Sequence, residues 1–216
     1  MTSLGNGIMD LIRPLQTVTP TLDGDVLAAL AAASEATFTT GQLHRVLHRH
    51  SEEGIRKVLQ RLSKQGTVLS SRVGHAFVYQ LNREHLAFPH VMGLADLSGE
   101  FLRRLEARLA GWEIPPMYAA VFGSAARGTM TINSDIDIFL VRPDDVAVEE
   151  WDEQVAELMA EVTRWTGNDA RDLQFAESEI AGRGTDEPVL RDVVKEGLTV
   201  AGSRAGFTRL LRRGNR

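Results

Sequence analysis

Residues 119–141 read "AAVFGSAARGTMTINSDIDIFLV", and this stretch decides how the C-terminal half of the chain folds. Its last residues, 136–141, are apolar except for Asp137, which predicts a buried strand. Asp135 and Asp137 stand at positions i and i+2, so their side chains point to the same face of that strand. Two neighbouring carboxylates repel each other, and burial increases the repulsion. We therefore expect a cation against this face, and a metal ion above all.

The loop that follows the preceding apolar strand, expected at residues 117–122, has the chemistry of a phosphate site. Gly123 has no Cβ, so a phosphate can approach its backbone. Ser124 adds a hydroxyl donor, and the neighbouring N–H groups can form an anion-binding nest. The carboxylates of Asp135 and Asp137 are hard oxygen ligands that suit Mg²⁺. One stretch thus predicts phosphate donors together with a metal platform.

The pattern Gly-Ser, ten further residues and Asp-x-Asp, with "ARG" at 126–128 and "SDID" at 134–137, resembles the nucleotidyltransferase superfamily that includes DNA polymerase beta. It is most similar to the minimal nucleotidyltransferases, over about residues 113–202. The resemblance implies a Mg²⁺-dependent transferase with two metal ions, which moves a nucleotidyl group from an NTP, expected to be ATP, to an acceptor. A chain of 216 residues is too small to house the fingers and template cleft of a polymerase, so we discount templated synthesis.

The resemblance also implies roles for single residues. Gly123 and Ser124 hold the β and γ phosphates, and Ser134 belongs to the same nucleotide-binding set. Arg127 pairs either with a phosphate or with an acid in a surface salt bridge. Asp135 and Asp137 are catalytic as metal ligands.

The family usually adds a third carboxylate on a later strand, here expected near "ARDLQFA", residues 170–176. Leu173 and Phe175 should face the core, which would leave Asp172 and Gln174 on the metal-site face. Asp172 is the expected third catalytic metal ligand. The alternative is a role near a turn or at the surface. The sequence departs from the family pattern here, because Arg171 precedes the acid and Gln174, the position best flanked by apolar residues, carries no charge. If Asp172 misses the site, catalysis is weak or lost.

Residues 20–86 resemble a winged helix-turn-helix domain. The pattern predicts helices at 25–33, 42–50 and 51–66, followed by a hairpin around Gly74. In such a domain the third helix enters the DNA major groove and the wing follows the backbone. The expected DNA-contacting residues lie on the third helix and at the hairpin tip: Arg56, Lys57, Gln60, Arg61, Lys64, Arg72 and His75. The alternative for this basic face is an ordinary solvated helix. We expect His44, His48 and His50 to be exposed polar residues of the second helix. Their spacing could bind a metal, but no carboxylate is placed to complete such a site.

The predicted organisation has five parts and an α+β fold class, in which a winged helix-turn-helix domain precedes an α/β nucleotidyltransferase domain with a mixed sheet. Residues 1–19 form an N-terminal segment, and 87–112 a connector in which Pro89 breaks the chain and a helix follows. Residues 113–203 form the transferase domain. Residues 204–216 form a basic tail whose arginines either touch nucleic acid or solvate a loose end.

Composition limits the function classes. The first 90 residues hold nine Lys or Arg against seven Asp or Glu and all six histidines, whereas the whole chain carries a net charge of −5. A weakly basic part joined to an acidic part indicates two tasks. There are no cysteines, no apolar run long enough to span a bilayer and no signal-peptide pattern, so we expect a cytoplasmic protein.

Three functions remain open from the sequence. The first is a nucleotidyltransferase that modifies a protein, an RNA or a small molecule, with a toxin-like protein partner as in toxin–antitoxin pairs. The second is a DNA-binding transcription regulator whose transferase domain only senses nucleotide. The third is a protein-interaction module. By analogy with DNA-binding domains that read two half-sites, we expect a homodimer.

Overall fold

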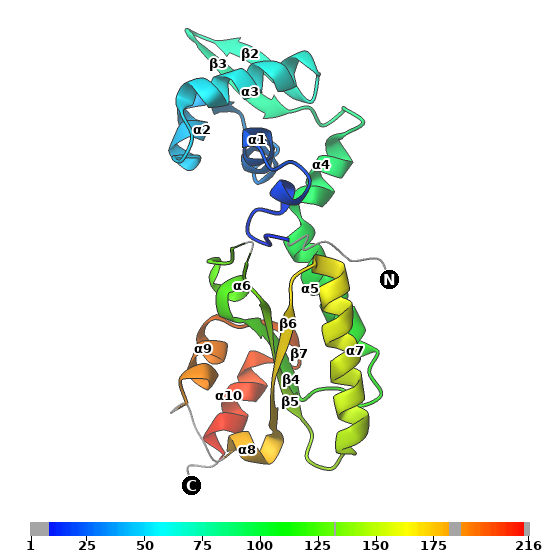
Figure 1. Cartoon of the computed structure of the whole chain (residues 1–216). Coiled ribbons are helices and arrows are strands. Elements are labelled where there is room, and N and C mark those ends of the chain that lie inside the picture. Colours follow the sequence, from blue (N-terminus) through cyan, green and yellow to red (C-terminus); the bar gives the residue numbers. More distant parts are fainter. Residues whose placement is uncertain (1–8, 132, 182–186, 214–216) are drawn as a thin grey trace. The chain divides into compact units, whose positions relative to one another are not determined.

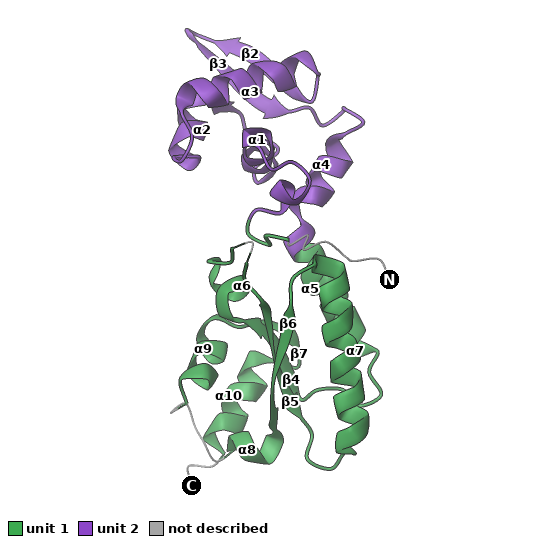
Figure 2. Ribbon diagram, in the orientation of Figure 1, with its two compact units in different colours: residues 1–12, 99–216 green, residues 13–98 purple. Residues whose placement is uncertain are grey.

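The computed structural model describes residues 9–131, 133–181 and 187–213, and their contacts divide the chain into two units. Unit 1 comprises residues 1–12 and 99–216, and unit 2 comprises residues 13–98 (Figure 2). This division cuts the expected connector, because its first part belongs to unit 2 and most of its helix to unit 1.

Unit 2 contains three helices followed by a hairpin, in the order that the sequence predicts. Its small antiparallel sheet has the strand order β1-β3-β2, because a two-residue strand that the sequence did not indicate pairs with the hairpin. The elements are η1 (Pro14–Thr17), α1 (Leu22–Ala31), β1 (Phe38–Thr39), α2 (Thr40–Val46), α3 (Glu52–Lys64), β2 (Val68–Val73), β3 (Ala76–Leu81) and α4 (Phe88–Ala95).

Helices α2 and α3 begin where capping side chains supply hydrogen bonds. Thr39 and Gln42 form a reciprocal capping box at α2, and the Ser51 hydroxyl accepts from the Gly54 N–H at 3.1 Å at the start of α3. The apolar stripe of α3 is buried in the core together with residues of α1, α2 and the hairpin, namely Val26, Leu30, Leu43, Ile55, Val58, Leu59, Leu62, Val68, Tyr79 and Leu81.

Pro89 starts a helix instead of breaking the chain. It occupies the first turn of α4, where a missing N–H costs nothing because that group has no partner inside the helix. Phe88, Val91 and Met92 of this helix pack against the core of unit 2.

A buried carboxylate ties η1, α1 and the α2–α3 turn together. Asp25 is only 7% exposed and accepts hydrogen bonds from Arg13 Nη2 (2.6 and 2.8 Å) and Gln16 Nε2 (2.9 Å). His50 Nε2 lies 2.7 Å from its Oδ2. His50 is therefore partly buried against a carboxylate instead of exposed as expected, because Asp25 reaches it from a distant helix.

The sheet of unit 1 has four strands in the order β6-β5-β4-β7, with β5 and β6 parallel and the other pairs antiparallel (Figure 1). It is a mixed sheet, as the sequence predicts. The strands are β4 (Tyr118–Phe122), β5 (Ile136–Arg142), β6 (Ala170–Ala176) and β7 (Leu198–Ala201), and the helices are α5 (Leu97–Ala110), α6 (Gly123–Arg127), α7 (Val148–Thr166), α8 (Glu177–Ala181), α9 (Pro188–Glu196) and α10 (Arg204–Arg212).

Helices cover both faces of this sheet. Helices α8, α9 and α10 pack on the face that carries Tyr118, Phe139 and Val141. Helices α5 and α7 lie on the other side (Figure 1), where Trp112 and Trp151 meet edge to face at 5.3 Å and Trp151 Nε1 donates to Gln174 of β6. Alternate residues of β5 therefore face different helical layers.

The expected basic tail is a packed helix over its described part. Phe207, Leu210 and Leu211 of α10 are buried in the core of unit 1, and Phe207 stacks on Tyr118 with ring centroids 4.3 Å apart. Arg213 pairs with Glu177 at 3.6 Å. The apolar stripe thus outweighs the basic character of this segment, which is no loose end.

No helix within residues 9–131, 133–181 and 187–213 is long and apolar enough to cross a membrane.

The Asp25 network predicts a pH-dependent contribution to the stability of unit 2. Burial by itself raises the pKa of Asp25, but the hydrogen bonds from Arg13 and His50 outweigh it, so the pKa is lowered overall. A lowered carboxyl pKa stabilises the fold at neutral pH, and this contribution is lost as the pH falls below about 4 towards the folded-state pKa. Asp25→Asn should lower the free energy of unfolding at pH 7 by about 2 kcal/mol and flatten the acid dependence.

Urea unfolding followed by circular dichroism measures this effect. The matched control is Asp23→Asn, which removes the more exposed pair with Arg61 and should change the free energy of unfolding by less than about 1 kcal/mol. Equal losses for both variants would contradict a special role of the buried network. All three tryptophans belong to unit 1, so their fluorescence reports whether that unit is unaffected.

Candidate functional site

The two aspartates of the opening stretch stand on one face of the sheet in unit 1. In the register of the sheet, Asp137 of β5 pairs with Phe122 of β4 on one side and with Arg171 of β6 on the other. Asp135, just before β5, contacts the same Arg171, whose Nη1 lies 2.9 Å from its Oδ2. The strand alternation thus places both carboxylates together, as the sequence predicts.

Gly123 makes room for Asp137. The residue has φ = +69°, which disfavours any side chain, and a Cβ built on it would lie 2.3 Å from Asp137 Oδ2. The carboxylate therefore rests directly against the backbone at the start of α6. The Gly-Ser loop and the Asp-x-Asp strand are one contiguous site in the fold, although ten residues separate the two motifs.

The electrostatics of the pair match this crowding. Burial raises the pKa of Asp137, and the charge of Asp135 raises it further, while Arg171 and Arg127 act in the opposite direction without cancelling the effect. Ionisation of Asp137 is therefore less favourable than that of a solvated aspartate. A bound cation would relieve both the repulsion and the desolvation.

Asp172 does not face the pair. It is in register with Ile138, so it shares the opposite face of the sheet with Gln174, which donates a hydrogen bond to Asp172 Oδ2 at 2.7 Å. The sequence reasoning assigned Leu173 correctly to a core, but that core lies on the same side as Asp137. The expected placement of Asp172 at the metal face is therefore wrong, and the side chains of β6 on that face are Arg171, Leu173 and Phe175.

The other expected nucleotide-binding residues surround the pair to different degrees. Arg127, at the end of α6, makes a salt bridge with Glu196 of α9 at 3.5 Å, which is the second of its two expected roles. The Ser134 hydroxyl accepts from the Thr131 N–H at 2.9 Å and shapes the turn before β5. Ser124 lies in α6, directly after Gly123.

Asn168 is a supporting residue that sequence reasoning missed. It is 1% exposed, its Nδ2 donates to the Ser134 carbonyl at 3.0 Å, and its Oδ1 accepts from the Met9 N–H at 3.1 Å. A buried Asn bonded to two distant backbone groups holds the turn that precedes Asp135. No local pattern indicated this role, because both partners are far away in the sequence.

The carboxylates fit one magnesium ion. Two carboxylates, completed by substrate phosphates and water, are a usual donor set for Mg²⁺. Within the described residues, however, no group of three or more His, Cys, Asp or Glu side chains could hold a metal. The donor set therefore lacks the third carboxylate that the family resemblance implied.

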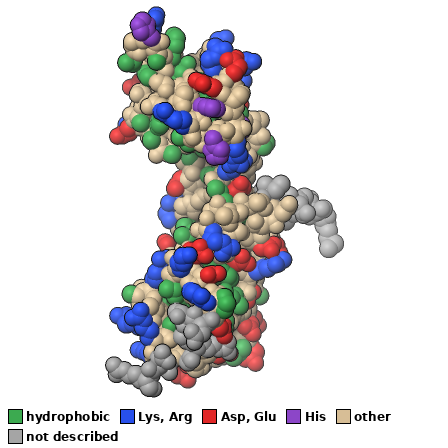
Figure 3. All heavy atoms as spheres, turned by 90° about the vertical axis from the view of Figure 1, so that its left-hand side faces the viewer, with side chains coloured by type: hydrophobic (Ala, Val, Ile, Leu, Met, Phe, Trp, Pro, Cys, Tyr) green, Lys and Arg blue, Asp and Glu red, His purple; other side chains and the backbone are tan. Residues whose placement is uncertain are grey.

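In unit 2, most of the expected DNA-contacting cations have acidic partners. Glu53 pairs with Arg56 at 2.6 Å and with Lys57 at 3.8 Å, and Asp23 pairs with Arg61 at 2.5 Å. On the face shown in Figure 3, Lys and Arg side chains are scattered among acidic ones and form no continuous patch. The basic helix face is thus partly neutralised within unit 2.

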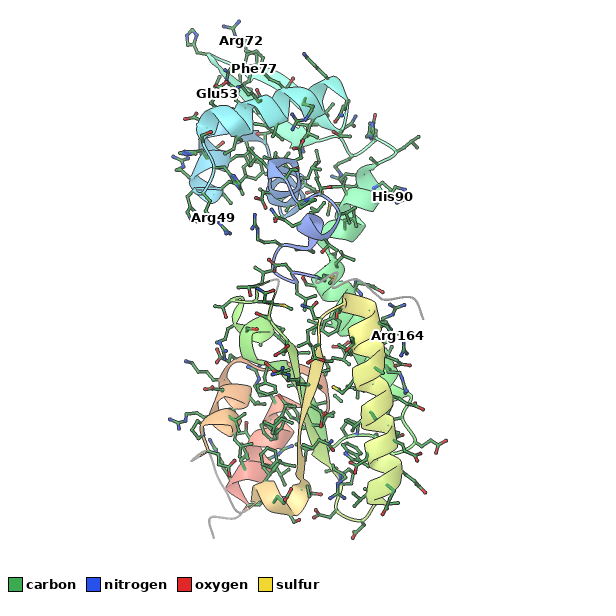
Figure 4. All side chains as sticks on the ribbon, viewed as in Figure 1. Arg49, Glu53, Arg72, Phe77, His90 and Arg164 are labelled. Atoms are coloured by element: carbon green, nitrogen blue, oxygen red, sulfur yellow. The ribbon has the colours of Figure 1, made fainter. Side chains whose placement is uncertain are left out.

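A groove between α3 and the hairpin holds the remaining expected residues of α3. It has a volume of about 410 Å³ and is lined by Gln60, Ser63, Lys64, Ser70, Phe77 and Tyr79. Figure 4 shows Arg72 and Phe77 on the hairpin, where they are cross-strand partners. Phe77 is 57% exposed, which the sequence did not single out. Arg72 bonds the Gly74 carbonyl at the hairpin turn, next to the exposed His75.

Comparison with known proteins identifies part of unit 1. Residues 110–186 match the family model described as a nucleotidyltransferase domain, which supports the superfamily assignment for this segment. The match does not reach unit 2. No curated protein sequence matches the chain.

Two solved structures show a limited similarity to this chain. One is a mutant of the toxin–antitoxin MntA-HpeT in which two aspartates are replaced by glutamates, with 17% identity and a TM-score of 0.38 over 53% of this chain and 83% of that chain. The other is a toxin–antitoxin with AMP-PNP, with 20% identity and a TM-score of 0.36 over 54% of this chain and 82% of that chain.

The raised pKa of Asp137 predicts that the carboxylate suited to bind Mg²⁺ lowers the stability of the metal-free protein. A raised carboxyl pKa means that the ionised form destabilises the fold at neutral pH. Asp137→Asn should therefore raise the melting temperature of the metal-free protein by about 2–4 °C. Mg²⁺ should raise the melting temperature of the unmodified protein but not of the variant.

Differential scanning calorimetry with and without Mg²⁺ measures both effects. Asp172→Asn is the matched control, because this residue lies on the opposite face of the sheet, and it should leave the response to Mg²⁺ intact. A lower melting temperature for Asp137→Asn without metal would show that the carboxylate is structural instead.

Proposed function

We propose that unit 1 is a Mg²⁺-dependent nucleotidyltransferase, which binds an NTP between α6 and β5 and transfers its nucleotidyl group to an acceptor. The observation that carries the proposal is the contact of Asp137 with the backbone of Gly123. It brings a metal-binding carboxylate to the loop whose composition suits phosphate. The family match of residues 110–186 supports the same reaction class.

Each residue near the pair has a task in this proposal. The carboxylates of Asp135 and Asp137 hold the cation, which when bound withdraws charge from the phosphates. Gly123 and Ser124 donate backbone N–H and hydroxyl hydrogen bonds to the β and γ phosphates. Arg127 exchanges Glu196 for a phosphate oxygen when the nucleotide binds. Ser134 keeps the turn before Asp135 in shape.

The net reaction forms a bond between an acceptor oxygen and the α phosphorus and releases pyrophosphate. The hydroxyl proton of the acceptor passes to solvent. A protein, an RNA or a small molecule can supply such a hydroxyl. We favour a protein acceptor, a toxin-like partner, on the resemblance of the motif region to the minimal nucleotidyltransferases, and ATP as the donor.

A label-transfer assay tests this function. Protein, Mg²⁺ and each α-labelled NTP are incubated with a cell lysate. Label should appear on an acceptor with the unmodified chain and with Asp172→Asn. It should fall to background with Asp135→Asn/Asp137→Asn, since the cation is then lost. Equal labelling by the double variant would exclude the proposed site.

A second function is supported for unit 2, which we propose to be a winged helix-turn-helix domain that binds DNA, as a homodimer on two half-sites. The groove between α3 and the hairpin favours it, because Lys64, Arg72 and the exposed ring of Phe77 combine charge with an apolar contact. Arg56, Lys57 and Arg61 would exchange their acidic partners for phosphates, while Gln60 and His75 would add polar contacts.

Salt dependence distinguishes this function from protein binding. The logarithm of the DNA affinity should fall linearly with the logarithm of the salt concentration. Lys64→Ala should reduce that slope by about 0.9, whereas Phe77→Ala should weaken binding without changing the slope. Fluorescence anisotropy over a NaCl series measures both quantities. An affinity that does not depend on salt would favour a protein partner for unit 2.

A further inference from the structure

Arg171 contacts two carboxylates at the candidate site. Its Nη1 lies 2.9 Å from Asp135 Oδ2, and its Nε lies 3.5 Å from the Oδ2 of Asp169. The guanidinium therefore connects two carboxylates on the sheet face that also carries Asp137. The side chain is 63% exposed, so it is held by these charges and not by packing.

The formal charges on this face match a single divalent ion. Asp135, Asp137 and Asp169 contribute three negative charges, and Arg171 contributes one positive charge. Arg127 does not change this balance, because Glu196 pairs with it. Two negative charges remain, which one divalent cation neutralises. A second divalent cation would leave these protein groups with two excess positive charges, and it would have to compete with the guanidinium for Asp135 and Asp169.

We propose that the Asp135–Asp137 site takes one divalent cation, not two, and that the guanidinium of Arg171 occupies the place of the second. This inference rests on the proposed nucleotide-binding function and specifies the metal content of the same site.

The chemistry of arginine makes it a stable substitute for a cation. Its guanidinium is always charged in proteins and presents five donors in a rigid fork that fits carboxylate oxygens. Mg²⁺, by contrast, demands near-octahedral geometry and loses water reluctantly. The next side chain of β6 on this face is Leu173, which offers no oxygen. Strand β6 therefore places no carboxylate on this face after Arg171, and the nearby acid Asp169 is held by the guanidinium.

The number of bound metal ions tests the inference. Mn²⁺ replaces Mg²⁺, α,β-methylene ATP serves as the nucleotide, and electron paramagnetic resonance of free Mn²⁺ gives the ions bound per bound nucleotide. The unmodified chain should bind one Mn²⁺. Arg171→Gln, which keeps the size but removes the charge, should bind two, because Asp135 and Asp169 are then available to a second ion.

The matched control is Asp172→Asn, whose side chain lies on the opposite face of the same strand. It should bind one Mn²⁺, like the unmodified chain. Two ions in the unmodified chain, or one ion in Arg171→Gln, would overturn the inference. Arg171 and Asp172 are both exposed, so both variants should fold. Circular dichroism spectra of the variants check this.

The nucleotide affinity separates this inference from the proposed function. Calorimetric titration with the same nucleotide should give binding to the unmodified chain and none to Asp135→Asn/Asp137→Asn. Absence of binding to the unmodified chain would overturn the proposed function and this inference together. Binding with two Mn²⁺ ions would overturn only the role of Arg171.

Discussion

A Cβ at residue 123 would lie 2.3 Å from the carboxylate oxygen of Asp137, and this lack of space determines the arrangement of the candidate site. The backbone at the start of α6 and the carboxylate on β5 can touch only because residue 123 is a glycine with positive φ. The loop that suits phosphate and the carboxylate that suits a metal thereby become neighbours. The opposing charges of Arg127 and Arg171 then limit the repulsion between the aspartates.

The close packing of Asp137 against Gly123 and Asp135 is also expected to lower the stability of the metal-free fold. Asp137 is partly removed from water and faces a second carboxylate, so its charge is unfavourable until a cation binds. Structural aspartates behave differently, as Asp25 shows in unit 2. There the carboxylate is less exposed, but its partners lower the pKa and its charge stabilises the fold. The pKa values of the two carboxylates thus shift in opposite directions, which accords with a structural role for Asp25 and the proposed binding role for Asp137.

Strand periodicity made unit 1 largely predictable from the sequence. The apolar runs predicted β4 and β5, and the i, i+2 spacing put Asp135 and Asp137 on one face. The third acid was misplaced because the sequence of β6 does not reveal its register against β5. Phe139, which follows the pair on the same face, is itself buried, so a core side chain on β6 does not point away from the site.

Long-range contacts account for the other differences. The pairing of His50 with Asp25 and of Asn168 with Met9 joins residues from separate elements, and no local pattern encodes such contacts. Pro89 was misinterpreted because proline can either interrupt regular structure or occupy the first turn of a helix. In α10 the arginines favoured the prediction of a basic tail, although the apolar stripe of the same segment packs into the core.

The most direct test of the account is the position of a bound metal and nucleotide. A crystal of the protein grown with Mn²⁺ and α,β-methylene ATP would locate the metal by anomalous scattering. We expect an anomalous peak between the carboxylates of Asp135 and Asp137, with the triphosphate against Gly123 and Ser124. A nucleotide bound elsewhere, or a triphosphate without a metal at these carboxylates, would contradict it.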